Sequence, residues 1–290
     1  MTKLMEHFAH SLLKTEVGRK VWSRLLGARS VTKRVGTFRE KESFGIVSRP
    51  NYVYGMLRAA DTAKFFGLSE VTVCEFGVAT GRGLINMMEV AVFIEQETGV
   101  RTRIVGFDTG TGLPAVIGYK DHPELWSGGD FSMGDPEQLR HALKDRAELI
   151  LGDINDTISR FATTLTPQCP LGFVSIDVDI YSGTVAALRV LQGESQCFLP
   201  AISFYLDDVG SYFSNEACGE LAAVAEHNQA NPMRPIFQDH SLPGRRSQPF
   251  ETWYKHMYAC HILDHPHRNR ARERGALSLD DHLAFMAVLK

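Results

Sequence analysis

The segment from Val71 to Gly83 constrains the fold of this chain more than any other. Residues suited to a buried strand lead into Glu75 and then into Gly77, Gly81 and Gly83, and a helical pattern begins directly behind them. Glycine lets a ligand lie against bare backbone, and doubly wound α/β folds place a nucleoside where a parallel strand ends. The segment therefore predicts such a fold, with a nucleoside at the carboxyl end of its first strong strand.

The spacing of these glycines separates the classes of nucleoside. A dinucleotide fingerprint needs G-x-G-x-x-G, but counting from Gly77 the second and third of those positions hold Ala79 and Arg82. No Gly-Lys-Ser/Thr follows, so a phosphate-cradling P-loop is excluded as well. The pattern that remains, Glu-x-Gly-x-x-x-Gly-x-Gly, resembles the first motif of class I S-adenosylmethionine (SAM) methyltransferases. A tight strand-to-helix turn without a ligand is the alternative interpretation.

Composition and charge narrow the class of protein. A chain of 290 residues suits one large α/β domain with appendages, and 44% hydrophobic and 22% charged residues are ordinary for a soluble globular protein. A net charge of -3 and a pI near 6.4 give no electrostatic reason to expect nucleic acid or a membrane as partner. No apolar run approaches the ~20 residues of a membrane span, and the charged N-terminus does not resemble a signal peptide.

Cysteine and histidine usage gives no sign of a zinc site. The five cysteines are scattered, with no C-x-x-C pair, which indicates reduced thiols and favours a cytoplasmic protein. They are Cys74, Cys169, Cys197, Cys218 and Cys260. His261, His265 and His267 lie in an arginine-rich stretch interrupted by a proline, so we expect a solvated tail there.

Apolar patterning predicts strands that alternate with helices, and hence a mostly parallel sheet with right-handed crossovers. We expect strands over 71–76, 103–107, 147–151, 172–176, 201–206, 234–238 and 252–262. We expect helices over about 52–67, 82–97, 136–146, 181–192 and 215–229. Two short amphipathic helices are predicted within residues 1–40. Their apolar positions are Leu4, Phe8, Leu12, Val21, Trp22 and Leu25.

Three regions are expected along the chain. Residues 1–50 should form a helical extension that caps the site or pairs the subunits of a homo-oligomer, and residues 51–263 a SAM-binding domain. Residues 264–290 should form a basic linker and a C-terminal helix. The Gly/Pro-rich loop 109–135 is long for a structureless connection, which favours a lid. Its Trp126 and Phe131 would cover the adenine or the acceptor, or else pack the loop down as a small satellite cluster.

An aspartate follows each of the second and third predicted strands. A carboxylate at Asp108, in step with the glycine loop, can accept both hydroxyls of an adenosine ribose. Asp153 is placed to accept from the adenine amino group, with Ile154 against the ring. Each aspartate also has an alternative interpretation. Asp108 would cap its loop, and Asp153 would belong to an ordinary Gly-Asp turn. The residues expected at the cofactor are Glu75, Gly77, Val78, Gly81, Asp108, Thr109, Asp153, Ile154 and Asp177.

Four aspartates follow strands four and five: Asp177, Asp179, Asp207 and Asp208. Adjacent parallel strands end at one edge of a sheet, so these carboxylates should repel one another unless a cation offsets them. With no Cys or His among them, a hard, oxygen-preferring ion is indicated, and Mg²⁺ fits best. Aspartates that merely cap the following helices are the alternative.

Taken together, these motifs resemble the macrocin O-methyltransferase (TylF-like) group of class I methyltransferases. The matching segments run in order from about residue 70 to 260. They are Glu75–Val78, Gly106–Thr109, Gly112–Pro114, Gly129–Phe131, Ile176–Ser182 and Leu206–Asp208. The group methylates sugar hydroxyls of natural products with SAM and Mg²⁺. Catechol O-methyltransferases have a similar metal pattern, which implies that Asp177, Asp207 and Asp208 hold Mg²⁺ here.

Two positions depart from these patterns. Catechol enzymes carry a basic lysine where this chain has Ile180, and the TylF-like group usually has Asp-Gly-Asp where Val178 lies between two aspartates. Asp179 is the predicted general base, because three acids suffice for the metal and a fourth can accept a proton. Asp177, as ligand and base together, is the second candidate. Isolated histidines such as His240 and His256 are more often structural.

The predicted function is therefore a SAM-dependent, Mg²⁺-assisted O-methyltransferase. Its partner would be a small hydroxylated acceptor, a sugar or another polyhydroxylated molecule. A SAM-binding regulatory or scaffold protein without catalysis is the alternative. An oxidoreductase is disfavoured by the glycine spacing.

Overall fold

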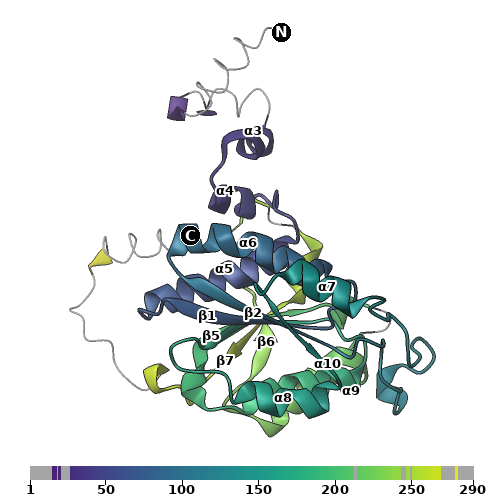
Figure 1. The fold of residues 1–290 in the computed structure, drawn as a ribbon. Helices are drawn as coiled ribbons and strands as arrows, with labels where there is room; N and C mark the ends of the chain where they lie inside the picture. The colour runs from purple at the N-terminus through teal and green to yellow at the C-terminus, as the bar shows by residue number, and fades with distance from the viewer. Residues whose placement is uncertain are drawn as a thin grey trace.

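The computed structural model describes residues 15–17, 19–20, 27–211, 214–242, 246–248, 250–268 and 278–279 (Figure 1). The predicted apolar positions from Leu4 to Leu25 and most of the predicted C-terminal region lie outside them. None of the described helices is long and apolar enough to cross a membrane.

One seven-stranded sheet organises the chain, with the strand order β3-β2-β1-β4-β5-β7-β6. The strands are β1 (Glu70–Phe76), β2 (Arg101–Asp108), β3 (Glu148–Leu151), β4 (Leu171–Ile176), β5 (Phe198–Leu206), β6 (Ile236–Gln238) and β7 (Met257–His261). The first five run parallel, and β7 lies antiparallel between β5 and β6. Strand order reverses between β1 and β4, so a crevice for a ligand is expected at their carboxyl ends. The predicted mostly parallel α/β fold is confirmed.

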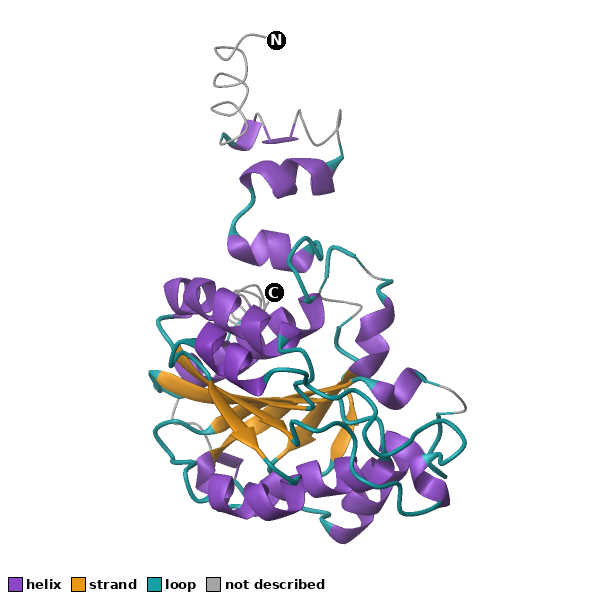
Figure 2. Cartoon of the chain, turned by 45° about the vertical axis from the view of Figure 1, so that its right-hand side comes forward, coloured by secondary structure: helices purple, strands orange, loops and turns teal. Residues whose placement is uncertain are grey.

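Helices cover both faces of the sheet (Figures 1 and 2). One layer holds α5 (Pro50–Phe65), α6 (Arg82–Thr98) and α7 (Pro136–Leu143), and the other holds α8 (Ile154–Ala162), α9 (Tyr181–Leu188) and α10 (Gly219–Ala230). The central strand β4 is buried at all of its residues, as expected for a parallel strand covered on both sides. The layers therefore leave the strand ends as the place for a site.

Helix α8 was absent from the predicted pattern. Its nine residues place Ile158 and Phe161 on one buried face, and Phe161 meets the ring of Phe107 edge-on at 5.0 Å. Several other elements are shorter than predicted, and two of them begin late. Residues Thr252–His256 form a 3₁₀ turn ahead of β7, and α10 begins only at Gly219, whose φ of +66° does not fit inside a helix.

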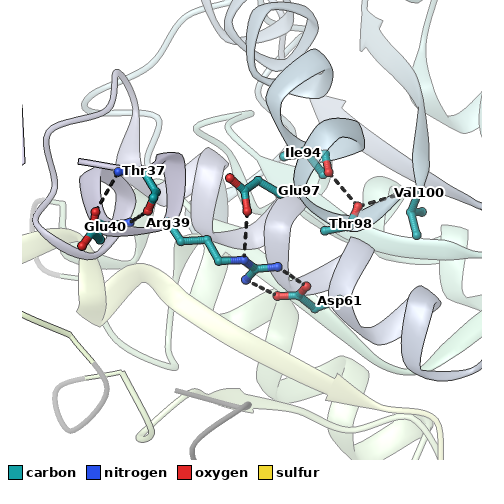
Figure 3. Close-up of polar contacts among 8 residues, drawn as sticks. All are labelled: Thr37, Arg39, Glu40, Asp61, Ile94, Glu97, Thr98 and Val100. Atoms are coloured by element: carbon teal, nitrogen blue, oxygen red, sulfur yellow. Dashed lines mark hydrogen bonds and ion pairs between the residues drawn. The ribbon is translucent and has the colours of Figure 1, made fainter. Parts of the chain in front are cut away.

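The N-terminal helices α3 (Ala28–Val35) and α4 (Phe38–Ser43) lie beyond the α5–α6 layer, away from the sheet (Figure 2). A capping box between Thr37 and Glu40 starts α4 (Figure 3). Arg39 then donates to both carboxylate oxygens of Asp61, at 2.9 and 2.6 Å, and lies 3.6 Å from a Glu97 oxygen. These ion pairs fasten α4 to α5 and α6.

The prediction of a solvated tail is wrong for His265, which is buried, whereas His261 and His267 are exposed. The His267 ring stacks on Phe66 with centroids 4.9 Å apart, and His265 stacks on His267 at 5.1 Å. His265 is only 5% exposed. Stacking on other rings covers the faces of the histidine rings. The arginine-rich sequence around them did not predict this packing.

Candidate active site

A cavity of about 390 Å³ lies at the carboxyl ends of the parallel strands. This volume falls within the roughly 300–1,000 Å³ common for small-molecule sites. Eight residues of the predicted cofactor set line the cavity, namely Glu75, Gly77, Val78, Asp108, Thr109, Asp153, Ile154 and Asp177. Gly81 does not line it. Gly81 instead precedes α6 and faces the side chain of Leu139.

Two glycines of the β1 loop are required by contacts within the protein. A Cβ on Gly77, where φ is +86°, would lie 1.7 Å from the carbonyl oxygen of Asp177. A Cβ on Gly83 would lie 1.7 Å from Oε1 of Glu75. The glycines therefore let the ends of β1 and β4 touch and make room for a buried carboxyl group, besides lining the cavity.

Asp108 holds the glycine loop in place. Its Oδ2 accepts the backbone N–H groups of Val78 and Ala79, at 2.9 and 2.8 Å, and its Oδ1 accepts that of Gly110 at 2.7 Å. Three of the roughly four acceptor sites of a carboxylate are thus occupied. The loop-capping interpretation describes this geometry. A contact to both ribose hydroxyls would require Asp108 to release or share one of these bonds.

The adenine candidates lie at the start of α8. Asp153 Oδ1 accepts the backbone and side-chain N–H groups of Asn155, at 2.8 and 3.0 Å, and so caps the helix. Ile154 follows on the cavity wall. Thr109 uses its hydroxyl to donate to the carbonyl of Gly112 at 2.5 Å. One oxygen of Asp153 is therefore used to cap the helix. The hydroxyl of Thr109 is used in a hydrogen bond within its own loop.

Glu75 is a buried carboxyl group on the cavity wall with one oxygen unused. The Tyr52 hydroxyl donates to Oε1 at 2.8 Å and accepts from the Ser175 hydroxyl at 2.9 Å. Oε2 is buried and has no hydrogen-bond partner among the described residues. Burial raises the pKa of Glu75 to about 8. A cationic donor in the cavity would therefore satisfy both the unused oxygen and its charge.

Replacing Glu75 by glutamine should stabilise the cofactor-free protein at alkaline pH. The folded pKa lies above the ordinary value of 4.5, so the stability gained by holding the proton is complete below pH 4.5 and is lost as the pH rises through about 8. Glutamine keeps an oxygen for Tyr52 but carries no charge. The difference in unfolding free energy should grow with pH by at most about 1.4 kcal/mol per unit. Thermal unfolding followed by circular dichroism tests this, and a difference that does not change with pH would contradict it.

Arg49 was not recognised from the sequence as a site residue. It lines the cavity, and its guanidinium lies 5.2 Å from the centre of the Tyr52 ring. Arg49 precedes Pro50, the first residue of α5, and has a left-handed backbone with φ of +46°. Such a conformation is uncommon for a residue other than glycine and is often found at functional sites. In the sequence, Pro50 marks a break before the predicted helix 52–67, but no pattern identifies Arg49 as a site residue.

The four aspartates gather where β4 and β5 end, as predicted. The backbone N–H of Asp179 donates to Asp208 Oδ2 at 3.1 Å, and the Tyr205 hydroxyl donates to Asp207 Oδ1 at 2.6 Å. The Asp177 carboxylate accepts no hydrogen bond from the described residues. Burial and then the charges of Asp207 and Asp208 raise the pKa of Asp177 to about 7. Burial and neighbouring aspartates likewise raise the pKa values of Asp179 and Asp208 to about 7.

The side chains of this cluster are of the right chemical type for a hard cation, but they are not arranged around a common point. Its free donor atoms are all carboxylate oxygens, which Mg²⁺ prefers, and their mutual repulsion would fall with a cation between them. However, no three Asp, Glu, His or Cys side chains among the described residues are arranged to hold a metal ion. Binding one would require Asp177, Asp207 and Asp208 to turn toward a common point.

The loop 109–135 is folded over the site. Its ends are joined by backbone hydrogen bonds between Leu113 and residues 129 and 130, at 2.8 and 2.7 Å. Asp121 is buried and accepts the backbone N–H and the hydroxyl of Ser182 at the start of α9, at 2.7 and 3.0 Å. Phe131 lines the cavity at the strand ends, and the Trp126 ring packs edge-on against the Phe131 ring at 5.7 Å. The loop thus forms a lid anchored on α9.

His240 and His256 lie outside the cavity at the strand ends. His240 is exposed, while Nδ1 of His256 lies 3.0 Å from the Leu206 carbonyl and its ring stacks on Tyr205. Among the described residues, no contact therefore favours either histidine as the general base.

Comparison with known proteins supports the fold. No protein-family model and no curated protein matches the chain. Among solved structures, the calicheamicin methyltransferase CalS11 superposes with a TM-score of 0.50 at 19% identity, over 90% of this chain and 94% of that one. The chain has the fold of a class I methyltransferase. The O-methyltransferase NovP gives a TM-score of 0.44 at 14% identity, over 72% of this chain and 78% of its own.

Proposed function

We propose that this protein is a SAM-dependent O-methyltransferase, assisted by Mg²⁺, that acts on a hydroxyl of a sugar or another polyhydroxylated small molecule. The observation that carries the proposal is the wall of the cofactor cavity. There, Glu75 offers a buried oxygen without a partner and Arg49 offers a cation, at the end of the sheet where the aspartates gather.

The residues that line the cavity would suit the two ends of SAM. The methionine part carries an ammonium group, which suits Glu75 Oε2, and a carboxylate, which suits the Arg49 guanidinium. The adenosine part would lie toward Asp108 and Asp153, which each retain acceptor capacity, with Ile154 against the base. This assignment uses the cavity residues without requiring Asp108 to leave the glycine loop.

The carboxylates then provide for the chemistry of transfer. The acceptor oxygen attacks the methyl carbon, the carbon–sulfur bond breaks with its electron pair remaining on sulfur, and the hydroxyl proton passes to Asp179. Asp177 is the second candidate for this base. When bound by Asp177, Asp207 and Asp208, Mg²⁺ would stabilise the negative charge that develops on the acceptor oxygen. The lid excludes water from the transfer.

We expect isothermal titration to show binding of SAM and none of NAD. Arg49→Ala should weaken SAM binding by about 10- to 150-fold, corresponding to the roughly 1.5–3 kcal/mol of a hydrogen bond to a charged group. Arg58→Ala is the matched control, because Arg58 lies in α5, which Arg49 directly precedes, and does not line the cavity. Equal SAM affinity in the two variants would refute the role of Arg49. NAD binding as tight as SAM binding would refute the cofactor.

A further inference from the structure

A second cavity, of about 230 Å³, shares Asp179 with the cofactor cavity. One wall comes from the lid and the other from the segment that leads into α10. The residues that matter here are His122, Leu125 and Trp126 on the lid side, and Ser214, Cys218 and Glu220 on the other. Because Asp179 lines both cavities, a molecule in the second cavity would present its atoms toward the proposed methyl donor.

Glu220 is the most unusual residue of this second cavity. It lies in the first turn of α10 and is only 3% exposed. Its Oε2 accepts the backbone N–H of Asp208 at 2.8 Å. Its Oε1 is buried and has no hydrogen-bond partner among the described residues. A buried carboxyl oxygen without a partner is costly, so its retention on a cavity wall points to a polar group supplied by a ligand.

The other walls indicate the class of that ligand. Trp126 offers an aromatic surface, and Ser214 adds a hydroxyl. A sugar ring has an apolar face that packs on aromatic side chains and a rim of hydroxyl groups that seek hydrogen bonds. The volume lies below the roughly 300–1,000 Å³ of sites for drug-sized ligands, which suits a single ring.

The lid closes directly on this segment. A Cβ on Gly219, where φ is +66°, would lie 3.5 Å from Nε2 of His122, so the His122 ring packs against the first residue of α10. Asp121, next to His122, anchors the lid on α9. The second cavity is therefore formed by the closed lid, between the same elements that position Glu220.

Building on the proposed function, we propose that the second cavity holds the sugar ring of the acceptor and that Glu220 fixes its orientation. Oε1 of Glu220 forms a hydrogen bond with one ring hydroxyl, while another hydroxyl faces Asp179. Glu220 thus acts as a specificity-determining residue and touches neither the methyl donor nor the reacting oxygen. An acceptor ring without a hydroxyl at the matching position would leave Oε1 unpaired and would be rejected.

Cys218 provides a reporter inside the cavity. Its thiol is free and partly exposed, and so are those of Cys169 and Cys197, which do not line the cavity. The full chain, saturated with S-adenosylhomocysteine to fill the first cavity, is alkylated with iodoacetamide and the rate at each cysteine is followed by mass spectrometry. The probes are the methyl glycosides of glucose, galactose, mannose and rhamnose, with cyclohexanol as a ring of one hydroxyl. At least one glycoside should slow alkylation of Cys218 and leave Cys197 unchanged, whereas cyclohexanol should protect poorly.

Glu220→Gln then tests the hydrogen bond itself. The Asp208 N–H needs an oxygen, so the amide must turn its NH₂ toward the cavity and the acceptor atom there is lost. The glycoside concentration that half-protects Cys218 should rise about tenfold or more. Glu216→Gln makes the same change of charge at an exposed position outside the cavity and should leave that concentration unchanged. Equal protection in the two variants would overturn the role of Glu220.

Separate readouts keep this proposal apart from the proposed function. If no glycoside protects Cys218 in the wild type although SAM binds by calorimetry, the sugar cavity is wrong and the cofactor site stands. If SAM fails to bind, the proposed function fails and takes the assignment of an acceptor with it. Circular dichroism and the melting temperature of Glu220→Gln establish that the variant is folded before its protection is compared.

Discussion

Replacing Asp207 and Asp208 together by asparagine should abolish methyl transfer and leave SAM affinity within about twofold of the wild type. Neither residue lines the cofactor cavity. Asparagine retains an amide oxygen to accept from the Tyr205 hydroxyl and from the Asp179 N–H, so the local fold should survive. What is lost is two negative charges. If the cluster supplies several kcal/mol through Mg²⁺, the rate should fall by about 1,000-fold or more.

The same result is expected when the metal is removed. Transfer of a labelled methyl group from SAM to a diol should stop in excess chelator and return on addition of Mg²⁺. An acceptor with two neighbouring oxygens can occupy two of the positions that three aspartates leave on an octahedral ion, so it should react faster than a lone alcohol. A double change of the exposed Asp145 and Asp156 to asparagine controls for net charge. Full activity in chelator and in the Asp207/Asp208 variant would refute the metal.

This experiment also decides between an enzyme and a SAM-binding protein without catalysis. In the second case Asp207 and Asp208 only shape the start of the segment that leads to α10, where Asp208 already donates its N–H to Glu220. SAM would then bind wild type and variant alike, and neither would transfer a methyl group to any polyol.

The sequence predicted the parts of this site that depend on strand ends. The apolar runs before Glu75, Asp108 and Asp177 are short and local, and the carboxyl ends of parallel strands must meet at one edge. The residue pattern alone therefore predicts that the four aspartates lie close together. The order of the strands, with its reversal at β1 and β4, then places them beside the cavity.

Roles that depend on loop conformation could not be predicted in this way. The acceptor sites of Asp108 are used by Val78 and Ala79 because the loop turns their N–H groups inward, with Ala79 at a φ of +45°. Nothing in the residue types announces that turn, since alanine rarely adopts it. The ribose contact was a reasonable expectation for an acid in that position, but the loop competes for the same oxygens.

The sequence also did not predict which charged residues are buried by packing between distant segments of the chain. Glutamate is almost never fully buried unless paired, so the sequence pattern placed Glu75 at the cofactor without predicting that its carboxyl group is buried, and it assigned no role to Glu220. Glu75 is buried because α5 brings Tyr52 above it, and Glu220 because α10 packs beside the end of β5. Arg49 belongs to the same class, since its position on the cavity depends on how α5 packs on the sheet.

Asp179→Asn should lower kcat by about 100- to 10,000-fold while SAM affinity and the melting temperature change little. Asparagine tolerates the left-handed backbone that Asp179 adopts, with φ of +61°, and the backbone N–H to Asp208 is kept. The only loss is the group that would take the proton from the acceptor. Steady-state kinetics at saturating SAM, with acceptor varied, should show the loss in kcat rather than in KM.

Two further variants test which carboxyl group is responsible for the loss in kcat. Asp179→Gly relieves the backbone strain as well as removing the carboxyl group, so it should be as inactive as Asp179→Asn if the carboxyl group is what matters. Asp177→Asn removes the second candidate base, which is also a proposed metal ligand. If Asp179→Asn and Asp179→Gly keep the wild-type kcat, Asp179 is not the base and Asp177 takes its place as the candidate. Asp179 would then be only a wall shared by the two cavities.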